Sequence, residues 1–248
     1  MAKTIAEWTA SDVAPAQDKP LRWLSERHFF RDPVRPVYSD ADLFFAPADG
    51  IILYQRIVDP AEALVEIKGV SYSLRQALRD PSFDQRCLVI GIFMTAYDVH
   101  INRIPYAGSL SWRELPSIES HNRPMLEVEE MLLGGRQHAA GHADYLFTNQ
   151  RMVNTIRVAR LGLSYHLLQI ADYDVATILP FNQHQSQPVQ QNQRFSQIRF
   201  GSQVDLILPL TPAFDYQILL ADGLHIEAGI DPLIRLRPLT TPDPRTVR

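Results

Sequence analysis

Short apolar runs separated by turn residues fill the chain from Leu43 onward, and this pattern predicts a mostly β domain. The longest run, 86–94, is apolar at nearly every position, which is typical of a strand covered on both faces. Val204, Leu206 and Leu208 alternate with their neighbours, so this later segment also predicts a strand. From Leu43 onward the pattern is that of a sheet domain rather than a helical one.

Several weaker patterns add strands to this sheet domain. Three are predicted at 145–147, 152–159 and 165–171. Asp222-Gly223 is a strong two-residue turn signal between the apolar segments 216–220 and 225–228, and it predicts a hairpin there.

Helices are expected to be few and short. Residues 73–78 begin with a serine suited to an N-cap, and 125–133 have helical content that Gly134 ends. A third short helix is predicted at 21–30. The fold class predicted from the whole pattern is α+β and mostly β: an antiparallel sandwich or hybrid-barrel-like sheet domain with a few short helices.

The length of 248 residues, 46% of them hydrophobic, is enough for one sizeable core, so a single domain is predicted over 21–239. Residues 1–20 lack periodicity and are expected to be a flexible N-terminal arm. The tail 240–248, which is rich in proline, is expected to be disordered.

Charge and composition exclude some classes of function. The net charge is −4 and no stripe of Lys and Arg stands out, so nucleic acid is not an expected partner. No run approaches the roughly 18 apolar residues of a membrane-spanning helix, and the single cysteine, Cys87, lies in an apolar strand. The protein is therefore expected to be cytoplasmic, and either soluble or peripherally associated with a membrane.

The Gly201-Ser202 pair stands between two apolar runs, late in the chain. On the local pattern alone, a strand with a bend at Gly201 is the favoured interpretation. Three segments upstream change this interpretation, because 45–50, 94–105 and 149–151 precede the pair in a familiar order. Together, over about 45–209, these segments resemble the phosphatidylserine decarboxylases, and most closely their short branch with an F-G-S cleavage motif.

The resemblance implies a self-cleaving proenzyme whose Ser202 becomes a covalent pyruvoyl cofactor. In that chemistry the Ser202 hydroxyl attacks the carbonyl of Gly201, and elimination from the resulting ester separates the two chains. Attack requires a base for the hydroxyl and donors for the oxyanion that develops. The pyruvoyl carbonyl then serves as the electron sink for removal of a carboxylate from an α-amino acid.

The resemblance also assigns site residues. His100 is the first choice for acid–base work, because imidazole titrates near working pH, although its spacing alone fits a structural histidine. Asp49 corresponds to the acid that orients the catalytic histidine, although an Asp in such a turn ordinarily caps backbone N–H groups. Ser202, His100 and Asp49 are therefore the predicted catalytic residues.

Longer relatives carry D-Y-H-x-x-H-x-P, with a second histidine that serves cleavage. Here Asp98 and His100 match the first part, and Arg103 stands where the second histidine would be. Arg103 is predicted either to bind a substrate carboxylate or phosphate or to form a structural ion pair. Asn149 and Arg151 belong to a segment that resembles the family's N-E-R, so these two residues and Asp98 are supporting candidates.

The leading functional prediction is conversion of phosphatidylserine to phosphatidylethanolamine with release of CO2. The alternatives are decarboxylation of a soluble or carrier-bound amino acid by the same chemistry, and a non-cleaving binding module on the same fold. No metal site is predicted, since only His138 and His142 have a helical ligand spacing, in a Gly/Ala-rich stretch. Peripheral membrane contact is one expected partnership, and a homodimer is one alternative for the oligomeric state.

Overall fold

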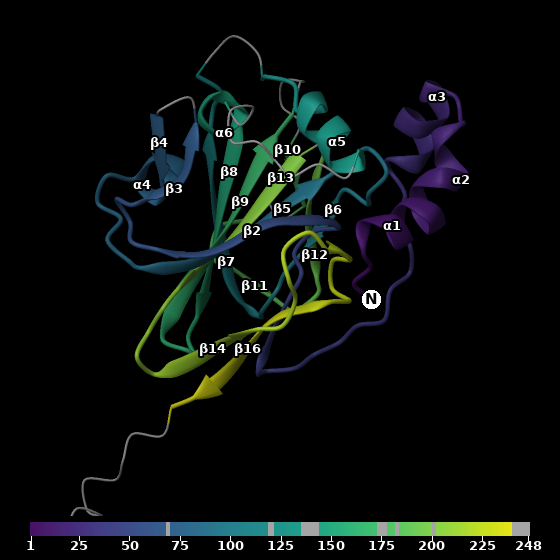
Figure 1. Ribbon diagram of the computed structural model, residues 1–248. Helices are drawn as coiled ribbons and strands as arrows, with labels where there is room; N and C mark the ends of the chain where they lie inside the picture. The colour runs from purple at the N-terminus through teal and green to yellow at the C-terminus, as the bar shows by residue number, and fades with distance from the viewer. Residues whose placement is uncertain are drawn as a thin grey trace, which may run out of the picture.

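The computed structural model describes residues 1–67, 70–118, 122–134, 144–172, 178–181, 184–199 and 202–239. Its centre is an antiparallel eight-stranded sheet in the order β11-β7-β8-β9-β13-β5-β2-β15 (Figure 1). The bounds of these strands, in that order, are Gln187–Val189, Gly108–Leu115, Arg151–Val158, Leu163–Ala171, Ser202–Pro209, Cys87–Met94, Gly50–Val58 and His225–Ile226.

Smaller sheets and short helices complete the fold. One three-stranded sheet contains β1 (Leu43–Phe45), β16 (Pro232–Pro238) and β14 (Phe214–Ile218), and another contains β10 (Ile178–Pro180), β12 (Arg194–Ile198) and β6 (Ile101–Arg103). β3 (Ala63–Ile67) and β4 (Val70–Ser73) pair with each other. The helices are α4 (Leu74–Leu78), α5 (Leu126–Leu133) and α6 (Tyr145–Thr148), with the N-terminal turns described below.

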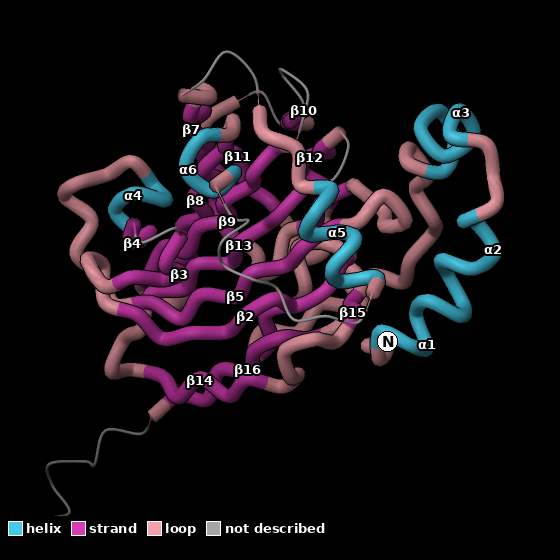
Figure 2. The backbone as a smooth tube through the Cα atoms, turned by 45° about the horizontal axis from the view of Figure 1, so that its top comes forward, coloured by secondary structure: helices cyan, strands magenta, loops and turns pink. Residues whose placement is uncertain are grey.

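The eight-stranded sheet is buried on both faces. One face packs against residues of the two three-stranded sheets, such as Phe44, Phe195 and Ile234. The opposite face packs against α4, α5, α6 and the β3-β4 pair, which lie together along that face in Figure 2. Two apolar layers on one sheet explain why β5 and β13 are buried at every position.

The N-terminal residues form short helical turns beside the sheet rather than a strand. They are α1 (Ile5–Trp8), the π-helical turn η1 (Thr9–Val13), α2 (Ala14–Gln17), α3 (Leu21–Trp23) and the π-helical turn η2 (Leu24–His28). Thr4 and Glu7 form a capping box at the start of α1, and Trp8 is buried. The flexibility predicted for 1–20 in solution stays a prediction, and the tail 240–248 lies outside the described residues.

One glycine in the apolar strand β5 is explained by an aromatic ring. A Cβ added to Gly91 would lie 2.4 Å from the ring of Tyr54, which crosses over it from β2. Tyr54 then donates a hydrogen bond to the buried carboxylate of Asp205 on β13 over 3.0 Å. Gly91 therefore lets one side chain bridge three neighbouring strands.

The predicted fold class, mostly β and antiparallel with few short helices, is confirmed. The predicted strands at 86–94, 152–159 and 165–171 and the helices at 73–78 and 125–133 are present with small shifts of their ends. The strand predicted at 145–147 is wrong, because these residues form α6. A three-residue apolar segment carries no periodicity that separates the two structures.

The hairpin predicted at Asp222-Gly223 is also wrong. The turn exists, with Gly223 at φ +80°, but the strands beside it pair elsewhere. β14 pairs with β16, and β15 pairs with β2 in the large sheet. The turn signal is local, whereas the partner of each strand is decided by the apolar face that it buries.

Candidate active site

Ser202 is the first residue of β13, the strand that lies between β9 and β5. Its register partners are Met94 on β5 and Ala171 on β9. The side chain is buried, and its hydroxyl donates a hydrogen bond to the Met94 sulfur over 3.2 Å. A thioether is a weak acceptor, so little free energy is lost when the hydroxyl leaves this hydrogen bond for another partner. Gly201, the other half of the predicted cleavage pair, lies outside the described residues.

His100 is tied to the same region by two short connections that leave the large sheet. Met94 pairs with Ser202 at one end of these connections. At the other end, the Ile198 amide donates to the His100 carbonyl over 3.1 Å. Ile198 precedes Ser202 by four residues, so these two residues are at most about 14 Å apart. The connection from Met94 to His100 and the connection from Ile198 to Ser202 are therefore joined at both ends, by the Met94–Ser202 pair and by the Ile198–His100 hydrogen bond.

His100 has a defined tautomer and an open ring nitrogen. Its Nδ1 lies 3.0 Å from the carbonyl oxygen of Asp98, and a carbonyl can only accept, so Nδ1 carries the proton. Nε2 is buried without a hydrogen-bond partner among the described residues. Burial lowers the pKa of His100 to about 4, against the opposing effect of Asp98. The neutral ring thus presents a bare lone pair at Nε2, which is the form that a general base requires.

Asp98 closes the turn that positions His100. Its Oδ2 accepts hydrogen bonds from the Thr95 amide and hydroxyl, both at 2.8 Å. Its Oδ1 lies 2.6 Å from Nε2 of His225, a residue 127 positions away in sequence. Thr95, Asp98 and His225 are all buried. The carboxylate therefore fixes the turn from one side and binds a histidine of the last part of the chain from the other.

The Asp98–His225 contact has the electrostatics of an ion pair. Burial lowers the pKa of His225, but the Asp98 carboxylate more than compensates and raises it above the ordinary value. Burial likewise raises the pKa of Asp98, and His225 together with the Thr95 hydrogen bonds brings it below the ordinary value. Trp8 stacks on the His225 ring with centroids 4.7 Å apart, which favours a charged imidazole.

The N-terminal segment covers the histidine region. Phe29 is buried and stacks on His100, with ring centroids 3.9 Å apart. Arg31 donates to the Asp98 carbonyl over 3.2 Å and to the Tyr97 carbonyl over 2.5 Å. Figure 1 shows the purple N-terminal turns on this side of the sheet. The segment that precedes β1 thus forms one wall of the region around His100.

Asp49 does not contact His100 in this structure. Its carboxylate forms a bidentate pair with Arg35, at 2.6 and 2.5 Å, and accepts the Ala228 amide at 2.8 Å. Burial raises the pKa of Asp49, and the Arg35 guanidinium opposes that effect. Asp49 thereby joins the N-terminal segment to the turn after β15, and its predicted orienting role stays a prediction.

The remaining predicted residues have structural partners. Arg103 is buried, donates to the Asn192 carbonyl over 3.1 Å and lies 3.7 Å from Asp32, as a structural ion pair would. Arg151 is buried on the face of the sheet that α4 covers, where it donates to the Tyr72 hydroxyl and to carbonyls of α4. Neither side chain contacts Ser202 among the described residues.

Asn149 lies nearer to the centre. Its amide nitrogen donates to the carbonyl of Ala171, the residue that pairs with Ser202, over 2.8 Å. The next residue, Asp172, accepts the Met125 amide over 2.8 Å at the start of α5. Asn149 and Asp172 therefore connect the strand end beside Ser202 to the start of α5, the helix that lies against the sheet in Figure 2.

Comparison with known proteins identifies the family. The family model described as phosphatidylserine decarboxylase matches residues 27–232. The chain belongs to the phosphatidylserine decarboxylase family. Members of this family are carboxy-lyases, so the chain is an enzyme of that class.

Individual relatives extend over most of the chain. The chain is 28% identical over 202 residues to a phosphatidylserine decarboxylase proenzyme from a Wolbachia species, covering 82% of this chain and 71% of that one. It is 33% identical over 183 residues to one from Erythrobacter litoralis, covering 73% and 62%. A protein from Methanopyrus kandleri, assigned as an archaetidylserine decarboxylase proenzyme, is 28% identical over 209 residues, covering 84% and 81%.

Sequence reasoning missed three residues of this family member's site: His225, Phe29 and Arg35. Each contacts its partner from another part of the chain, so no local motif marks it. The one available signal is compositional, because His225 is an isolated histidine within a β pattern after Asp222-Gly223. His138 and His142 lie outside the described residues.

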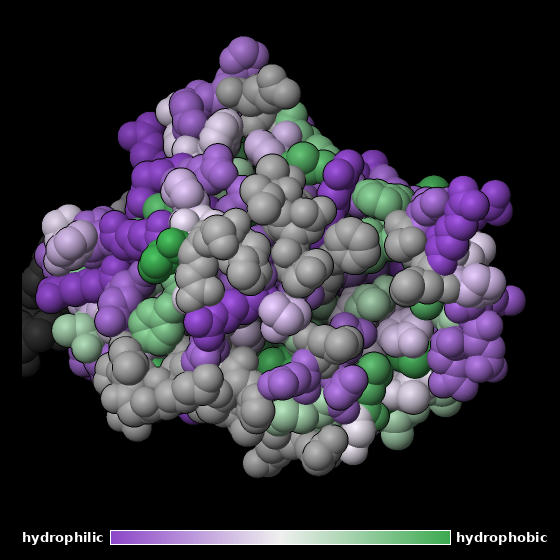
Figure 3. All heavy atoms as spheres, turned by 90° about the horizontal axis from the view of Figure 1, so that it is seen from above, coloured by the Kyte–Doolittle hydropathy of each residue, from purple (hydrophilic) through white to green (hydrophobic). Residues whose placement is uncertain are grey.

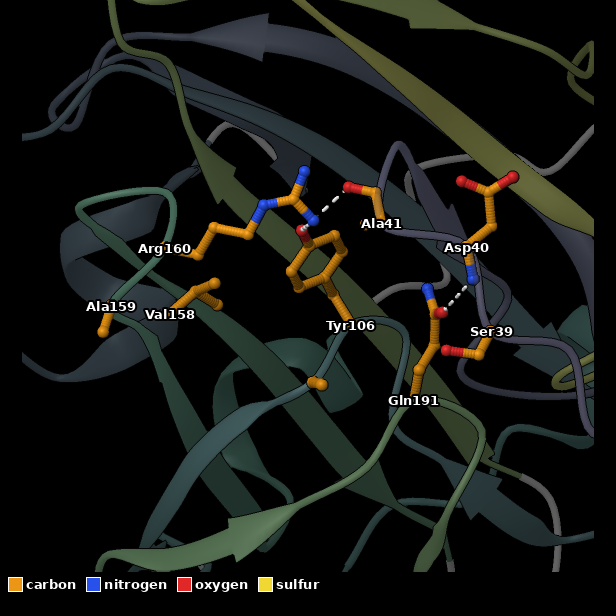
Figure 4. A pocket seen from close by; sticks show the side chains of 9 residues that line it. Ser39, Asp40, Ala41, Tyr106, Val158, Ala159, Arg160 and Gln191 are labelled. Atoms are coloured by element: carbon orange, nitrogen blue, oxygen red, sulfur yellow. Dashed lines mark hydrogen bonds between the residues drawn. The ribbon is translucent and has the colours of Figure 1, made fainter.

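A cavity of about 230 Å³ lies apart from the family site. It is lined by Ser39, Asp40, Ala41, Tyr106, Ala107, Val158, Ala159, Arg160 and Gln191 (Figure 4). None of these is a predicted site residue, and their polar groups largely satisfy one another: Tyr106 donates to the Ala41 carbonyl, and the Asp40 amide donates to Gln191. The cavity therefore contains none of the predicted catalytic residues.

The Asp98–His225 pair predicts a pH-dependent stability. The raised pKa of His225 means that its contribution is fully present below its unfolded value of about 6.5 and is lost as pH rises through the folded value. The lowered pKa of Asp98 means that its contribution is lost as pH falls below about 3.9. Replacing His225 with Gln should therefore cost ~3 kcal/mol near pH 5–6, and less above the folded pKa of His225.

Urea unfolding of His225→Gln between pH 5 and 9, in an uncut Ser202→Ala background, measures this dependence. His166→Gln is the matched control, because His166 is a half-buried histidine whose pKa burial lowers to about 4. The His166 substitution should show no cost that shrinks as pH rises. A cost at His225 that is constant from pH 5 to 9 would contradict the ion pair.

Proposed function

We propose that the chain is a proenzyme that cuts itself between Gly201 and Ser202 and then decarboxylates the serine headgroup of a phospholipid, phosphatidylserine first. One observation carries this proposal: within a chain that matches the family over 27–232, Ser202 begins the central strand, and the connection that follows its partner strand β5 bears the neutral His100. A pyruvoyl group at position 202 supplies the electron sink that decarboxylation of an α-amino acid needs.

The residues present suit the formation of that group. Ser202 retains an intact hydroxyl whose partner is a weak acceptor, so it can be turned toward the peptide bond before it. His100 presents an unpartnered Nε2 that can take the hydroxyl proton. Because Arg103 is engaged by Asn192 and Asp32, His100 is the proposed base in cleavage as well as in proton transfer during decarboxylation.

Substrate choice rests on the relatives. Proteins named for phosphatidylserine and for archaetidylserine are both similar to this chain, and their substrates share a serine headgroup on phosphate. Phosphatidylserine is the proposed substrate of this chain because most of the similar proteins carry that name. A free amino acid is the alternative that the assays below distinguish.

Membrane contact is proposed to be peripheral. No helix among the described residues is long and apolar enough to cross a membrane. Phe29 is buried on His100, so of the Trp and Phe residues in 21–30 only Trp23 and Phe30 remain for such contact, and Phe30 is 41% exposed. Val34 and Val37, on the same segment, are exposed as well. Among the described residues in Figure 3, hydrophobic side chains are interspersed with hydrophilic ones rather than gathered into one broad patch.

Two chains, 1–201 and 202–248, should be found after maturation, the second blocked at its N-terminus. Intact-mass measurement of the purified protein tests this. Ser202→Ala should remain one uncut chain without activity, because no hydroxyl is left to attack. A fully active preparation that shows only the uncut mass would falsify the proposal, and a folded wild type that neither cuts nor decarboxylates would favour the binding module.

His100→Ala should slow self-cleavage by about 10²–10⁴-fold, the usual contribution of general acid–base catalysis. Chains that do cut should still decarboxylate slowly, since the same imidazole handles both protons. The time course is followed by gel electrophoresis, with His166→Ala as a control at a half-buried histidine that pairs with Ile207 rather than Ser202. If His100→Ala cleaves itself and decarboxylates substrate at the wild-type rates, His100 has a structural role only.

Turnover of phosphatidylserine should require vesicles or detergent and weaken with salt. Arg22 and Arg27 each add about 1 kcal/mol of attraction to an anionic surface, and Arg22 is already paired with Glu26 at 3.0 Å. Replacing both Phe30 and Val34 with Ser should lower the vesicle-bound fraction at least about tenfold, because it removes the exposed apolar contact.

Liposome flotation at low and high salt, beside assays with phosphatidylserine and with free serine, measures this. Ile118→Ser, at an exposed apolar residue outside the N-terminal segment, is the control and should leave binding unchanged. A protein that never floats and prefers free serine would exclude the phospholipid substrate and leave the cleavage chemistry intact.

A further inference from the structure

Three buried amide side chains form a chain of hydrogen bonds that ends beside Ser202. Asn154 on β8 donates to Gln169 on β9 over 2.9 Å, and Gln169 donates to Asn102 on β6 over 2.6 Å. The Asn102 amide nitrogen then faces the sulfur of Met94 at 3.6 Å. The same sulfur accepts the hydrogen bond of Ser202 at 3.2 Å. The amide chain thus reaches the group that the cleavage chemistry uses.

The direction of this chain is fixed by backbone carbonyls at its far end. The Asn154 nitrogen lies 3.5 and 3.3 Å from the carbonyl oxygens of Met152 and Leu167, which can only accept. The same Asn154 nitrogen faces Gln169. The Gln169 oxygen must therefore point toward Asn154, and the Gln169 nitrogen must point toward Asn102. The Asn102 oxygen accepts from that nitrogen, which leaves the Asn102 N–H groups directed at the Ser202 side.

Burying polar amide side chains in an apolar layer costs free energy wherever an N–H group lacks a good acceptor. Asn102, Gln169 and Asn154 are all buried, within the apolar layer on one face of the large sheet. The three amides bond to one another in series at 2.9 and 2.6 Å, whereas the terminal N–H of Asn102 meets only a thioether. A buried donor held against a weak acceptor is free to bond a stronger one when it forms.

We propose that Asn102 is the hydrogen-bond donor that stabilises the oxyanion formed in self-cleavage, with Gln169 and Asn154 as its positioning residues. This rests on the proposed cleavage at Ser202. When Ser202 Oγ bonds to the carbonyl carbon of residue 201, the carbonyl electron pair moves to its oxygen, two bonds from Oγ. The hydroxyl proton passes to the base; the carbon–nitrogen bond then breaks, and a proton ends on the amine of residue 202.

Met94 is the placeholder in the resting chain. Its side chain is unbranched and flexible, so the sulfur can move aside as negative charge develops. Charged oxygen is a far better acceptor than sulfur, so the Asn102 N–H bonds more strongly in the transition state than before it. That difference is what accelerates a reaction, since a donor satisfied equally in both states would not.

The test compares self-cleavage of Asn102→Leu, Asn102→Asp and Gln169→Glu with wild type. Loss of one oxyanion donor slows such steps on the order of 100-fold, which is the expected result for Asn102→Leu. Asn102→Asp is nearly isosteric and donates only when its carboxyl is protonated. Its cleavage should therefore slow as pH rises from 6 to 9, and the cleavage rate of wild type should not show this decrease. Gln169→Glu should also slow cleavage, because the new carboxylate turns the Asn102 amide around.

Asn192→Asp is the matched control: it makes the same chemical change at a buried asparagine whose nitrogen bonds the Tyr38 carbonyl instead. It should cut at the wild-type rate. Thermal unfolding of each variant in the Ser202→Ala background separates slow cleavage from poor folding. Folded Asn102→Leu that cuts as fast as wild type overturns the donor role, as does a loss of cleavage that tracks loss of folding in all three variants. A wild-type chain that does not cut refutes the proposed function instead.

Discussion

The buried carboxylate of Asp98 is the constraint on which the site depends. The carboxylate holds the Thr95 turn and pairs with His225 from the last part of the chain. The backbone carbonyl of the same residue fixes the tautomer of His100. A buried charge without partners is strongly unfavourable, so these contacts are maintained together or lost together. The histidine geometry is thus a property of a network that draws on both ends of the sequence.

The large sheet supplies the other fixed point. β13 lies between β9 and β5, and both of its faces are covered, so the position of Ser202 is set by two registers at once. A slip of one residue would exchange the two apolar faces of the strand. Rigid strands on both sides and loops at the reacting end are a common arrangement for catalytic groups, because strands hold them more precisely than loops do.

The sequence predicted what is local and repeated. The apolar run at 86–94 and the alternation after Ser202 sufficed for the two central strands, and the resemblance directed attention to His100. What it could not predict depends on distant pairing: Phe29 on His100, His225 on Asp98, and the strands beside Asp222-Gly223. Composition and spacing carry no information about which distant side chain fills a given wall, since many sequences satisfy the same local pattern.

The central place of β13 has a consequence for the protein after a cut before Ser202. The strand pairings with β5 and β9, and the contact of His225 with Asp98, would then join two separate chains. The shorter chain would contribute the middle of the sheet, so it could not leave without exposing both apolar layers. Such a molecule is an obligate heterodimer, and its unfolding becomes concentration-dependent and hard to reverse, because two fragments must find each other again.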